Sequence, residues 1–531
     1  MTTADLNFGD LLDEVAMAIP DRPAIIHGAR VTSWQAFDER SNRLARKLIE
    51  LGLTPGSKVA FYLRNTPAYL ELFAACAKAR LTHANVNYRY VDHELFHVLD
   101  NSDAEAVVYD AEFKPHIEVL APRLNKVQAY IEVGGSETSI INKTIATTSF
   151  ETACTQGDAA RINIRRSGKD LYFMYTGGTT GYPKAVMWQH QDRIAVIGMT
   201  EAVTAKAHGQ SIANAPPGPV VLAACPLMHS TGFTTSISTL VSGGCVVLLP
   251  TPAFDARVCL EEIEKRRVDR MAIVGDAFSV PILEHLRLYP EKYDLTSVSV
   301  ISSAGAMWSA SRKLELLKYF PNATLADSLG SSEGSRLGAS TTKSGDTSET
   351  GAFQLGPNAK VFTEDFCEVV PGSGEAGLIA TSGAIPLGYY KDEERTAKTF
   401  PTINGVRYSM AGDWCKLEAD GAMILLGRGN NCINSGGEKI YPEEVEEALK
   451  TMPEIYDAAV IGIADERWGQ TVVAVIHLQN EISLESAKIR DHLSTRLARY
   501  KHPKKTVFVN TSFRHDNGKV NYRAVNALLT T

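Results

Sequence analysis

The chain has 531 residues, more than one ordinary hydrophobic core accommodates, so we expect two or three domains. Hydrophobic residues make up 44% of the chain and charged residues 22%, which is typical of a globular enzyme and not of a disordered or fibrous protein. The formal net charge of −7 argues against a general nucleic-acid-binding surface. Eight cysteines without a close pair at metal-ligand spacing fit free thiols in a reducing compartment, so we expect a cytoplasmic protein.

The amino terminus and the most apolar segment bear on membrane association. Residues 1–6 are acidic and lack the basic and apolar regions of a signal peptide. The most apolar segment, 220–228, is too short to cross a bilayer and contains Pro226. We therefore expect no integral membrane segment.

Residues 1–430 alternate short apolar runs with segments of helical periodicity. The run 58–63 is predicted to be a strand, and in the segment before it apolar side chains recur at close to helical spacing. These side chains are Trp34, Phe37, Leu44, Leu48 and Ile49. Such alternation predicts a layered α/β architecture, in which ligands gather at the carboxyl ends of the strands.

A loop rich in glycine and threonine follows the apolar run 171–175, which is predicted to be a buried strand. Glycines let backbone N–H groups curl around anionic oxygens, threonine hydroxyls add neutral donors, and a terminal lysine supplies positive charge. The loop is therefore a candidate polyphosphate cradle. However, Pro183 before the lysine departs from the Walker A pattern, and an ordinary turn after a strand is the alternative. Its candidate ligand-binding residues are Thr176, Gly177, Gly178, Thr179, Thr180, Gly181 and Lys184.

Two later segments have small side chains that let a flat group approach the backbone. The strand predicted at 298–301 runs into a turn of small residues at 302–306. The segment 326–333 combines serine and glycine with a terminal glutamate, and by itself it is equally well explained as a surface loop.

A domain boundary is predicted at 427–431, where glycines and amides interrupt an apolar strand at 423–426. Beyond it a helix is predicted to begin at Pro442, with acidic residues in its first turn as the helix dipole favours. Two strands follow, at 458–461 and 472–476, and then an amphipathic helix. We expect a large layered α/β domain and a small mobile α+β domain, 1–428 and 429–531.

In their order along the whole chain, several segments resemble motifs of the adenylate-forming superfamily, which contains acyl-CoA synthetases, luciferases and the adenylation domains of peptide synthetases. They include the loop 176–184, the segment 326–333, Gly412-Asp413, the stretch 427–444 and Gly518-Lys519-Val520. The resemblance implies that a small carboxylic acid is activated with ATP, with release of pyrophosphate, and that a second nucleophile then takes the acyl group. In acyl-CoA synthetases that nucleophile is the thiol of coenzyme A, so the implied cofactors are ATP, Mg²⁺ and coenzyme A.

The resemblance also implies roles around the nucleotide. Ser332 would donate to the α-phosphate, and Glu333 would hold Mg²⁺, a hard cation that prefers carboxylate and phosphate oxygens. Asp413 would accept hydrogen bonds from the ribose hydroxyls, although Gly-Asp is also an ordinary turn, and Arg428 would contact ribose or phosphate. The backbone around adenine would come from Gly305, Ala306, Asp327, Ser328, Leu329 and Gly330.

Lys519 corresponds to the catalytic lysine of the superfamily. A cation that bridges the substrate carboxylate and the α-phosphate offsets their repulsion, and removing such a contact typically costs ~3–4 kcal/mol of barrier. A lysine in a carboxy-terminal loop is usually only solvated, and the family-like residues at 500–504 and 517–518 favour the catalytic interpretation.

The resemblance further implies that the small domain rotates after adenylation and brings the segment 434–442 into the pantetheine channel. Ser435, Gly436 and Gly437 would line that channel, whereas without the resemblance the segment simply caps the helix at Pro442. Asn430 stands where relatives usually have a hinge aspartate or lysine, so the pivot is left open.

His229 stands where relatives place a gate between the acyl and pantetheine pockets, and a satisfied core histidine is the alternative. Phe233, Met307 and Trp308 are candidates either for the acyl pocket or for simple core.

The resemblance implies a carboxylate–CoA ligase, similar to bacterial synthetases for fatty acids or steroid side chains. One alternative keeps adenylation but passes the acyl group to another acceptor, such as an amine, or activates an unusual acid such as nitrite. A second alternative is a non-catalytic nucleotide sensor, against which the presence of Glu333, Asp413 and Lys519 together argues. The oligomeric state is left open, with a homodimer among the expected states.

Overall fold

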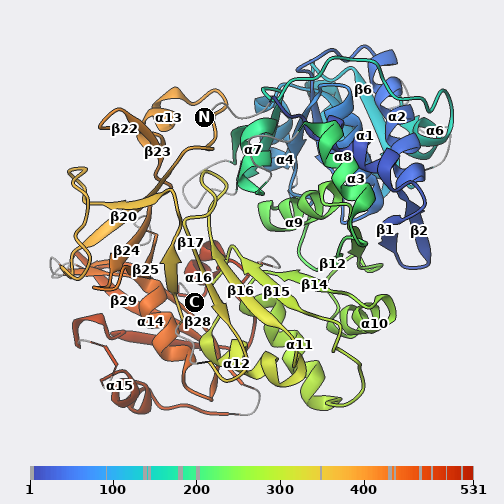
Figure 1. Cartoon of the computed structure of the whole chain (residues 1–531). Helices are drawn as coiled ribbons and strands as arrows, with labels where there is room; N and C mark the ends of the chain where they lie inside the picture. The colour runs from blue at the N-terminus through green and yellow to red at the C-terminus, as the bar shows by residue number, and fades with distance from the viewer. Residues whose placement is uncertain are drawn as a thin grey trace.

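The computed structural model describes the chain except for residues 1–4, 91, 136–139, 142–144, 177–182, 199–203, 347–349, 429–432, 436–437, 466–468, 480–481, 495, 498, 516–517 and 530–531. Figure 1 shows a large part, coloured blue to light orange, with a smaller carboxy-terminal part in deep orange and red packed against one side of it. The predicted α/β class, with a large first domain and a small second domain, is confirmed. The division between residues 428 and 429 stays a prediction, because 429–432 lie outside the described residues.

An eight-stranded sheet forms the first layer of the large domain. In spatial order its strands are β21 (Gly388–Tyr389), β11 (Lys184–Gln189), β10 (Leu171–Thr176), β4 (Thr82–Asn85), β3 (Lys58–Tyr62), β5 (Ala104–Asp110), β6 (Ala129–Val133) and β9 (Thr148–Ser149). The strands from β10 to β6 in this order run parallel, so their carboxyl ends share one edge.

A second sheet has 15 strands and is parallel in its first half. In spatial order, the strands of this first half are β2 (Arg30–Ser33), β1 (Pro23–His27), β13 (Cys245–Leu248), β12 (Val220–Ala223), β14 (Arg270–Ile273), β15 (Val300–Ala304) and β16 (Thr324–Leu329). The others are β17 (Gly338–Thr342), β18 (Ala352–Leu355), β25 (Ala422–Arg428), β24 (Asp413–Leu417), β20 (Ala376–Ser382), β23 (Val406–Ser409), β22 (Thr402–Ile403) and β19 (Ala359–Phe362). Apart from β2, which pairs antiparallel at one edge, the run from β1 to β16 is parallel, so its strands also end at a common edge.

Helices cover both sheets of the large domain. They are α1 (Phe8–Ala18), α2 (Trp34–Glu50), α3 (Pro67–Lys78), α4 (Asp92–Asn101), α5 (Lys114–Leu120), α6 (Phe150–Thr155), α7 (His190–Val196), α8 (Ala205–Asn214), α9 (Ser230–Val241), α10 (Ala256–Arg266), α11 (Asp276–Leu288), α12 (Ala310–Tyr319) and α13 (Glu393–Thr399). The helix predicted before β3 is α2, which begins after Ser33, whose hydroxyl accepts a hydrogen bond from the N–H of Ala36. Its predicted apolar face is buried except for Ile49, which is exposed.

The small domain is a second, separate α+β unit. Its sheet contains β27 (Glu438–Ile440), β26 (Ile433–Ser435), β29 (Gly469–Leu478), β28 (Ile455–Asp465) and β30 (Lys505–Val509). Its helices are α14 (Pro442–Lys450), α15 (Ser486–Ser494) and α16 (Tyr522–Ala527). The helix predicted from Pro442 is α14, and the two predicted strands lie inside β28 and β29.

The segment predicted as a turn begins as a strand, and so does the segment for which a surface loop was the alternative. Residues 302–304 belong to β15 and residues 327–329 belong to β16, because each strand is hydrogen-bonded on both sides. The first turn therefore begins only at Gly305, whose φ of +93° is a conformation that glycine adopts without strain. Serine and alanine have weak intrinsic preferences, so pairing with neighbouring strands decides their conformation.

The described part of the chain can be compared with the predictions about membrane segments and cysteines. Every helix there is too short or too polar to cross a membrane. The seven cysteines described are free thiols, as predicted, and six of them are buried.

Candidate active site

The phosphate-loop candidate connects two antiparallel strands at the shared carboxyl edge of the first sheet. Thr176 at the end of β10 pairs with Lys184 at the start of β11. Lys184 forms an ion pair with Asp392, and the hydrogen bond from the lysine, together with its charge, holds the pKa of that carboxyl below its usual value. The loop residues Gly177, Gly178, Thr179, Thr180 and Gly181 lie outside the described residues, so their predicted role stays a prediction.

Asn85 fixes the base of this loop, and the sequence analysis did not identify it. Its side-chain amide donates to the carbonyl oxygens of Tyr175 at 3.2 Å and Met228 at 2.7 Å. Its side-chain oxygen accepts from the N–H of Tyr175 at 2.6 Å. This buried amide therefore joins the ends of β4 and β10 to the segment that carries His229. A polar residue at the end of a buried parallel strand is the signal that could have indicated it.

The segment with Ser332 and Glu333 is held by hydrogen bonds to its backbone. The indole N–H of Trp188 donates to the carbonyl oxygen of Ser332 at 2.9 Å. The hydroxyl of Ser409 donates to the carbonyl oxygen of Glu333 at 2.6 Å. These contacts position both side chains beside the carboxyl end of β16 without using the groups that the predicted chemistry needs.

Glu333 provides the carboxylate for the predicted Mg²⁺ site. Its Oε1 accepts from the Tyr389 hydroxyl at 2.8 Å, and burial together with the carboxylate charge raises the pKa of Tyr389. Among the described residues there is no group of three or more His, Cys, Asp or Glu side chains that could cage a metal. A single carboxylate with a neighbouring hydroxyl fits Mg²⁺, which completes its shell with water and phosphate oxygens. Glu333 is thus the residue that would hold the ion, which would neutralise phosphate charge there, and Ser332 beside it would donate to the α-phosphate.

The adenine-site candidates present backbone, because the side chain of Asp327 turns away from the site. Its carboxylate pairs with Lys313 of α12 at 2.8 Å, and both side chains are buried. Burial raises the pKa of Asp327, although the charge of Lys313 opposes that effect. The predicted use of the backbone from Asp327 to Gly330, with Gly305 and Ala306, is therefore compatible with this geometry and stays a prediction.

The ribose-site candidates lie opposite each other on two strands. Asp413 begins β24, and its Cα partner in β25 is Arg428. Asp413 is buried. The register places the predicted acceptor and the predicted cation at the same end of the strand pair, next to the start of the small domain.

Lys519 of the small domain lies near His229 of the large domain. His229 precedes the first residue of α9. Burial, and next the positive charge of Lys519, lower the pKa of His229 to about 3, so this imidazole is neutral at pH 7. The small domain is therefore oriented so that the predicted catalytic lysine faces the large domain.

Arg193 links the two segments that Lys519 would serve, and the sequence analysis did not identify it. One guanidinium nitrogen donates to the Ser335 hydroxyl at 2.7 Å, and the other donates to the Ser230 hydroxyl at 3.3 Å. The guanidinium also lies 5.1 Å from the centre of the Trp188 ring. The Glu333 segment and the His229 segment thus flank a single side chain.

The remaining predicted site residues have different surroundings. Phe233 stacks on His83 with ring centroids 5.2 Å apart, and Trp308 is fully buried, so both belong to the core. Ser435 ends β26 and pairs with Glu438, whereas Gly436, Gly437 and the hinge candidate Asn430 lie outside the described residues.

Comparison with known proteins defines the class of this chain. Residues 12–390 match the family of AMP-binding enzymes, and residues 444–519 match the AMP-binding enzyme C-terminal domain. The chain belongs to this family of ligases, which confirms the predicted resemblance to adenylate-forming enzymes.

Two curated relatives are similar over nearly their whole length. The chain is 38% identical to the medium/long-chain-fatty-acid–CoA/3-oxocholest-4-en-26-oate–CoA ligase of Mycolicibacterium smegmatis, covering 98% of this chain and 95% of the relative. It is 36% identical to the 3-oxocholest-4-en-26-oate–CoA ligase of Rhodococcus rhodochrous, with the same coverage of 98% and 95%. Among solved structures, the anthranilate CoA ligase AuaEII in complex with anthranoyl-AMP has a TM-score of 0.86 at 20% identity and covers 100% of this chain and 98% of that one, a likeness of fold.

Proposed function

We propose that the chain is an AMP-forming acid–thiol ligase that activates a carboxylic acid with ATP and transfers the acyl group to coenzyme A. The single observation that carries the proposal is that Gly518, the residue before Lys519, lies against the large domain, where a Cβ atom added to it would be 2.8 Å from the Cβ of Ala277 and 3.6 Å from that of Ala306. The predicted catalytic cation of the small domain therefore follows a residue that touches the domain carrying the Ser332 hydroxyl and the Glu333 carboxylate. A nucleotide sensor has no evident use for this arrangement.

In the first half-reaction a carboxylate oxygen attacks the α-phosphorus of ATP, and pyrophosphate leaves. Carboxylate and phosphate repel each other as they approach, and Lys519 offsets that repulsion where the charge is concentrated. The Ser332 hydroxyl donates to an α-phosphate oxygen, and Asp413 accepts from the ribose hydroxyls. Mg²⁺ held at Glu333 would supply charge neutralisation of the phosphates.

In the second half-reaction the thiol sulfur of coenzyme A attacks the acyl carbon, the bond to AMP breaks, and the thiol proton passes to solvent or AMP. No side-chain nucleophile is needed, because AMP is already a good leaving group. The neutral state of His229 suits a gate through which an uncharged acyl chain and pantetheine arm pass, since a charged imidazole would be costly there. The segment with Ser435, Gly436 and Gly437 would line this passage after rotation of the small domain.

We propose a fatty acid or a steroid-type acid as the substrate class, because the relatives at 36–38% identity carry those substrates in their names. The cytoplasm as location, a homodimer as assembly, and 428/429 as the domain boundary are parts of the same proposal.

A screen of acids for conversion of ATP to AMP, run with and without coenzyme A, tests the proposal. We expect a long-chain or steroid acid to give a thioester whose formation depends on coenzyme A. AMP formation that ignores coenzyme A but responds to an added amine would favour the alternative acceptor. A wild-type protein that is inert with every acid would favour the nucleotide sensor.

A further inference from the structure

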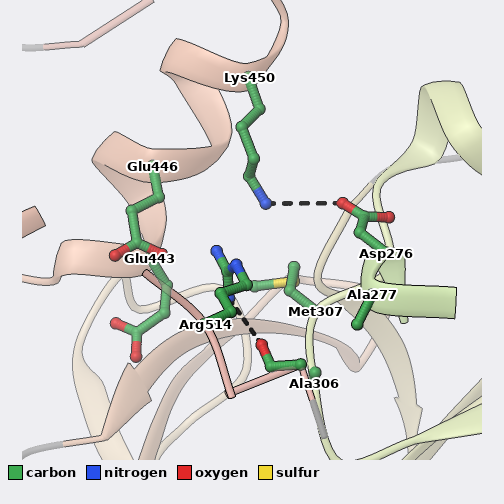
Figure 2. A pocket seen from close by; sticks show the side chains of 9 residues that line it. Asp276, Ala277, Ala306, Met307, Glu443, Glu446, Lys450 and Arg514 are labelled. Atoms are coloured by element: carbon green, nitrogen blue, oxygen red, sulfur yellow. Dashed lines mark hydrogen bonds and ion pairs between the residues drawn. The ribbon is translucent and has the colours of Figure 1, made fainter. Parts of the chain in front are cut away.

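The contact between the two domains contains an ion pair that joins helix ends from each of them. Figure 2 shows Lys450, the last residue of α14, pointing across the interface at Asp276, the first residue of α11. The distance from Lys450 Nζ to Asp276 Oδ2 is 3.7 Å. A second carboxylate, that of Glu447 on the same helix, lies 3.6 Å from the ammonium group.

Lys450 is charged although it is mostly buried. Its side chain is 10% exposed. Burial opposes the charge, but the carboxylates of Asp276 and Glu447 outweigh it and raise the pKa of Lys450. If the small domain turned, Glu447 would travel with Lys450 and Asp276 would stay behind. The pair with Asp276 therefore exists only in the orientation seen here.

Asp276 is held in place on its own side of the interface. Its Oδ1 accepts from the N–H of Ser309 at 3.1 Å, and its Oδ2 accepts from the Ser309 hydroxyl. Because two donors of a neighbouring loop fix the carboxylate, it presents Lys450 with a charge in one position. A rigid partner of this kind selects one orientation of the domain that docks on it.

Arg514 connects the residue before Lys519 to the rest of the small domain. Its Nε and Nη2 donate to the carboxylate of Asp457 in β28 at 2.6 and 2.9 Å, and its Nη1 donates to the carbonyl oxygen of Gly518 at 2.9 Å. Burial opposes its charge, but the carboxylate of Asp457 outweighs burial and raises the pKa of the guanidinium above its ordinary value. The residue before Lys519 is thus tied to the framework of the small domain through two bonds to one carboxylate.

Gly518 is the point where this framework meets the large domain. A Cβ atom added to Gly518 would lie 2.8 Å from the Cβ of Ala277, the second residue of α11. The cavity between these groups measures about 30 Å³, enough for one or two waters and too small for an organic ligand. The interface is therefore a contact that positions groups and not a further substrate site.

We propose that Asp276 and Lys450 latch the small domain in the adenylating orientation and that Arg514 sets the position of Lys519 within it. All three are positioning residues, since each acts on the reaction through Lys519. The inference rests on the proposed two-step function, and it makes breakage of the Asp276–Lys450 pair a condition for the thioester-forming orientation.

The test measures the two half-reactions separately on the full-length protein. Exchange of pyrophosphate into ATP without coenzyme A reports adenylation, and thioester formation from a supplied acyl-adenylate and coenzyme A reports transfer. We expect Asp276→Asn and Lys450→Met each to lower exchange about tenfold, between the effects of exposed and fully buried pairs. Transfer should be unchanged or faster, because the latch no longer opposes rotation.

Further variants separate the latch from a general loss of stability. The double variant should be no slower in exchange than either single variant, because all three lack the same pair. Lys450→Arg keeps the cation and should recover most of the exchange rate, and Arg514→Lys should lower exchange while leaving transfer intact. Glu315→Gln is the matched control, since it breaks an exposed pair with Arg287 between α11 and α12 inside the large domain. Both half-reactions should be unchanged in it.

Equal losses in both half-reactions, or independent effects of the two single variants, would overturn the latch. If Asp276→Asn unfolds, the comparison of Lys450→Met with Lys450→Arg still decides. A wild type without exchange activity on any acid would remove the proposed function itself, and that result is distinguishable from an active wild type whose variants lose both steps equally.

Discussion

The lysines at the ends of α3 and α14 are both buried, yet their surroundings differ. Lys78 has no exposed side-chain surface, and its ammonium group lies 3.1 Å from Asp13, donates to the Ser41 hydroxyl at 2.8 Å and to the Asn42 side-chain oxygen at 2.9 Å. Lys450 lies 3.6 and 3.7 Å from its carboxylates, beyond hydrogen-bonding distance. The ammonium group of Lys78 is hydrogen-bonded inside one domain. The ammonium group of Lys450 is attracted to a carboxylate of the other domain, from which it can separate.

The difference shows how one residue type serves a fixed core and a movable interface. Burial opposes ionisation of Asp13, raising its pKa, but the charges of Lys78, Arg166 and Arg161 outweigh burial and hold that pKa below its usual value. Short hydrogen bonds of this kind lock a network, because each broken member leaves a buried charge without compensation. Oppositely charged groups at a longer distance still attract each other and so favour one orientation of the two domains. Because they are not hydrogen-bonded, less free energy is needed to separate them.

The largest effect should appear when the fixed network is broken. Lys78→Met removes the buried cation shared by Asp13 and Asp38 and leaves the Ser41 and Asn42 oxygens without their donor, so it should lower the free energy of unfolding by about 3 kcal/mol, although Arg166 and Arg161 still pair with Asp13. The matched substitution Lys450→Met should lower it by only about 1–2 kcal/mol, between the effects of exposed and fully buried pairs. Denaturant unfolding of both variants measures the difference, and equal losses would contradict the distinction between the two lysines.

The next largest effect should come from removing the predicted catalytic lysine, Lys519. Lys519→Ala should slow pyrophosphate exchange by about 10²–10³, a barrier increase of ~3–4 kcal/mol, with an unchanged Tm. Lys505→Ala, at an exposed position in β30, is the control and should exchange at the wild-type rate. A wild-type rate in Lys519→Ala would show that the small domain contributes no catalytic cation.

A smaller effect is expected on the large-domain side of the site. Glu333→Gln should raise the Mg²⁺ concentration needed for half-maximal exchange by about tenfold or more, because an amide oxygen binds the ion more weakly than a carboxylate. Tyr389→Phe removes the hydroxyl that donates to Glu333 and leaves its charge, so the Mg²⁺ requirement should change by less. If both variants shifted the requirement equally, Glu333 would act through Tyr389 and not as a ligand.

The smallest effect is a pH dependence at the meeting point of the domains. The pKa of His229 is lowered from 6.5 to about 3, so the folded state disfavours a proton that the unfolded chain accepts. The stability linked to this group is complete above pH 6.5 and is lost as pH falls toward 3. Relative to His229→Asn, the wild type should lose about 1 kcal/mol between pH 7 and 5.5. Thermal unfolding over this range measures it, and parallel pH profiles of the two proteins would count against a neutral imidazole at His229.

Local patterns were sufficient for the order of elements and for several site candidates. Helix α14 follows from proline at its first position and acidic residues in its first turn, which are preferences of single residues. The strand before Thr176 follows from a continuous apolar run, and the adjoining glycines and threonines mark the turn. Residues 302–304 were predicted wrongly as part of a turn, because strand pairing outweighs the weak preferences of their small side chains.

By itself, then, the sequence determined the alternation of strands and helices, the small second domain and the chemical character of the motifs, since these depend on neighbours along the chain. Only the tertiary structure decided that Asn85 braces the phosphate loop, that Arg193 joins the segments of Ser335 and Ser230, and that Asp276 meets Lys450. Each of these contacts joins residues far apart in sequence, and a single polar side chain carries no local sign of a distant partner. Packing of whole elements brings such groups together, so their pairing becomes visible only once the chain is folded.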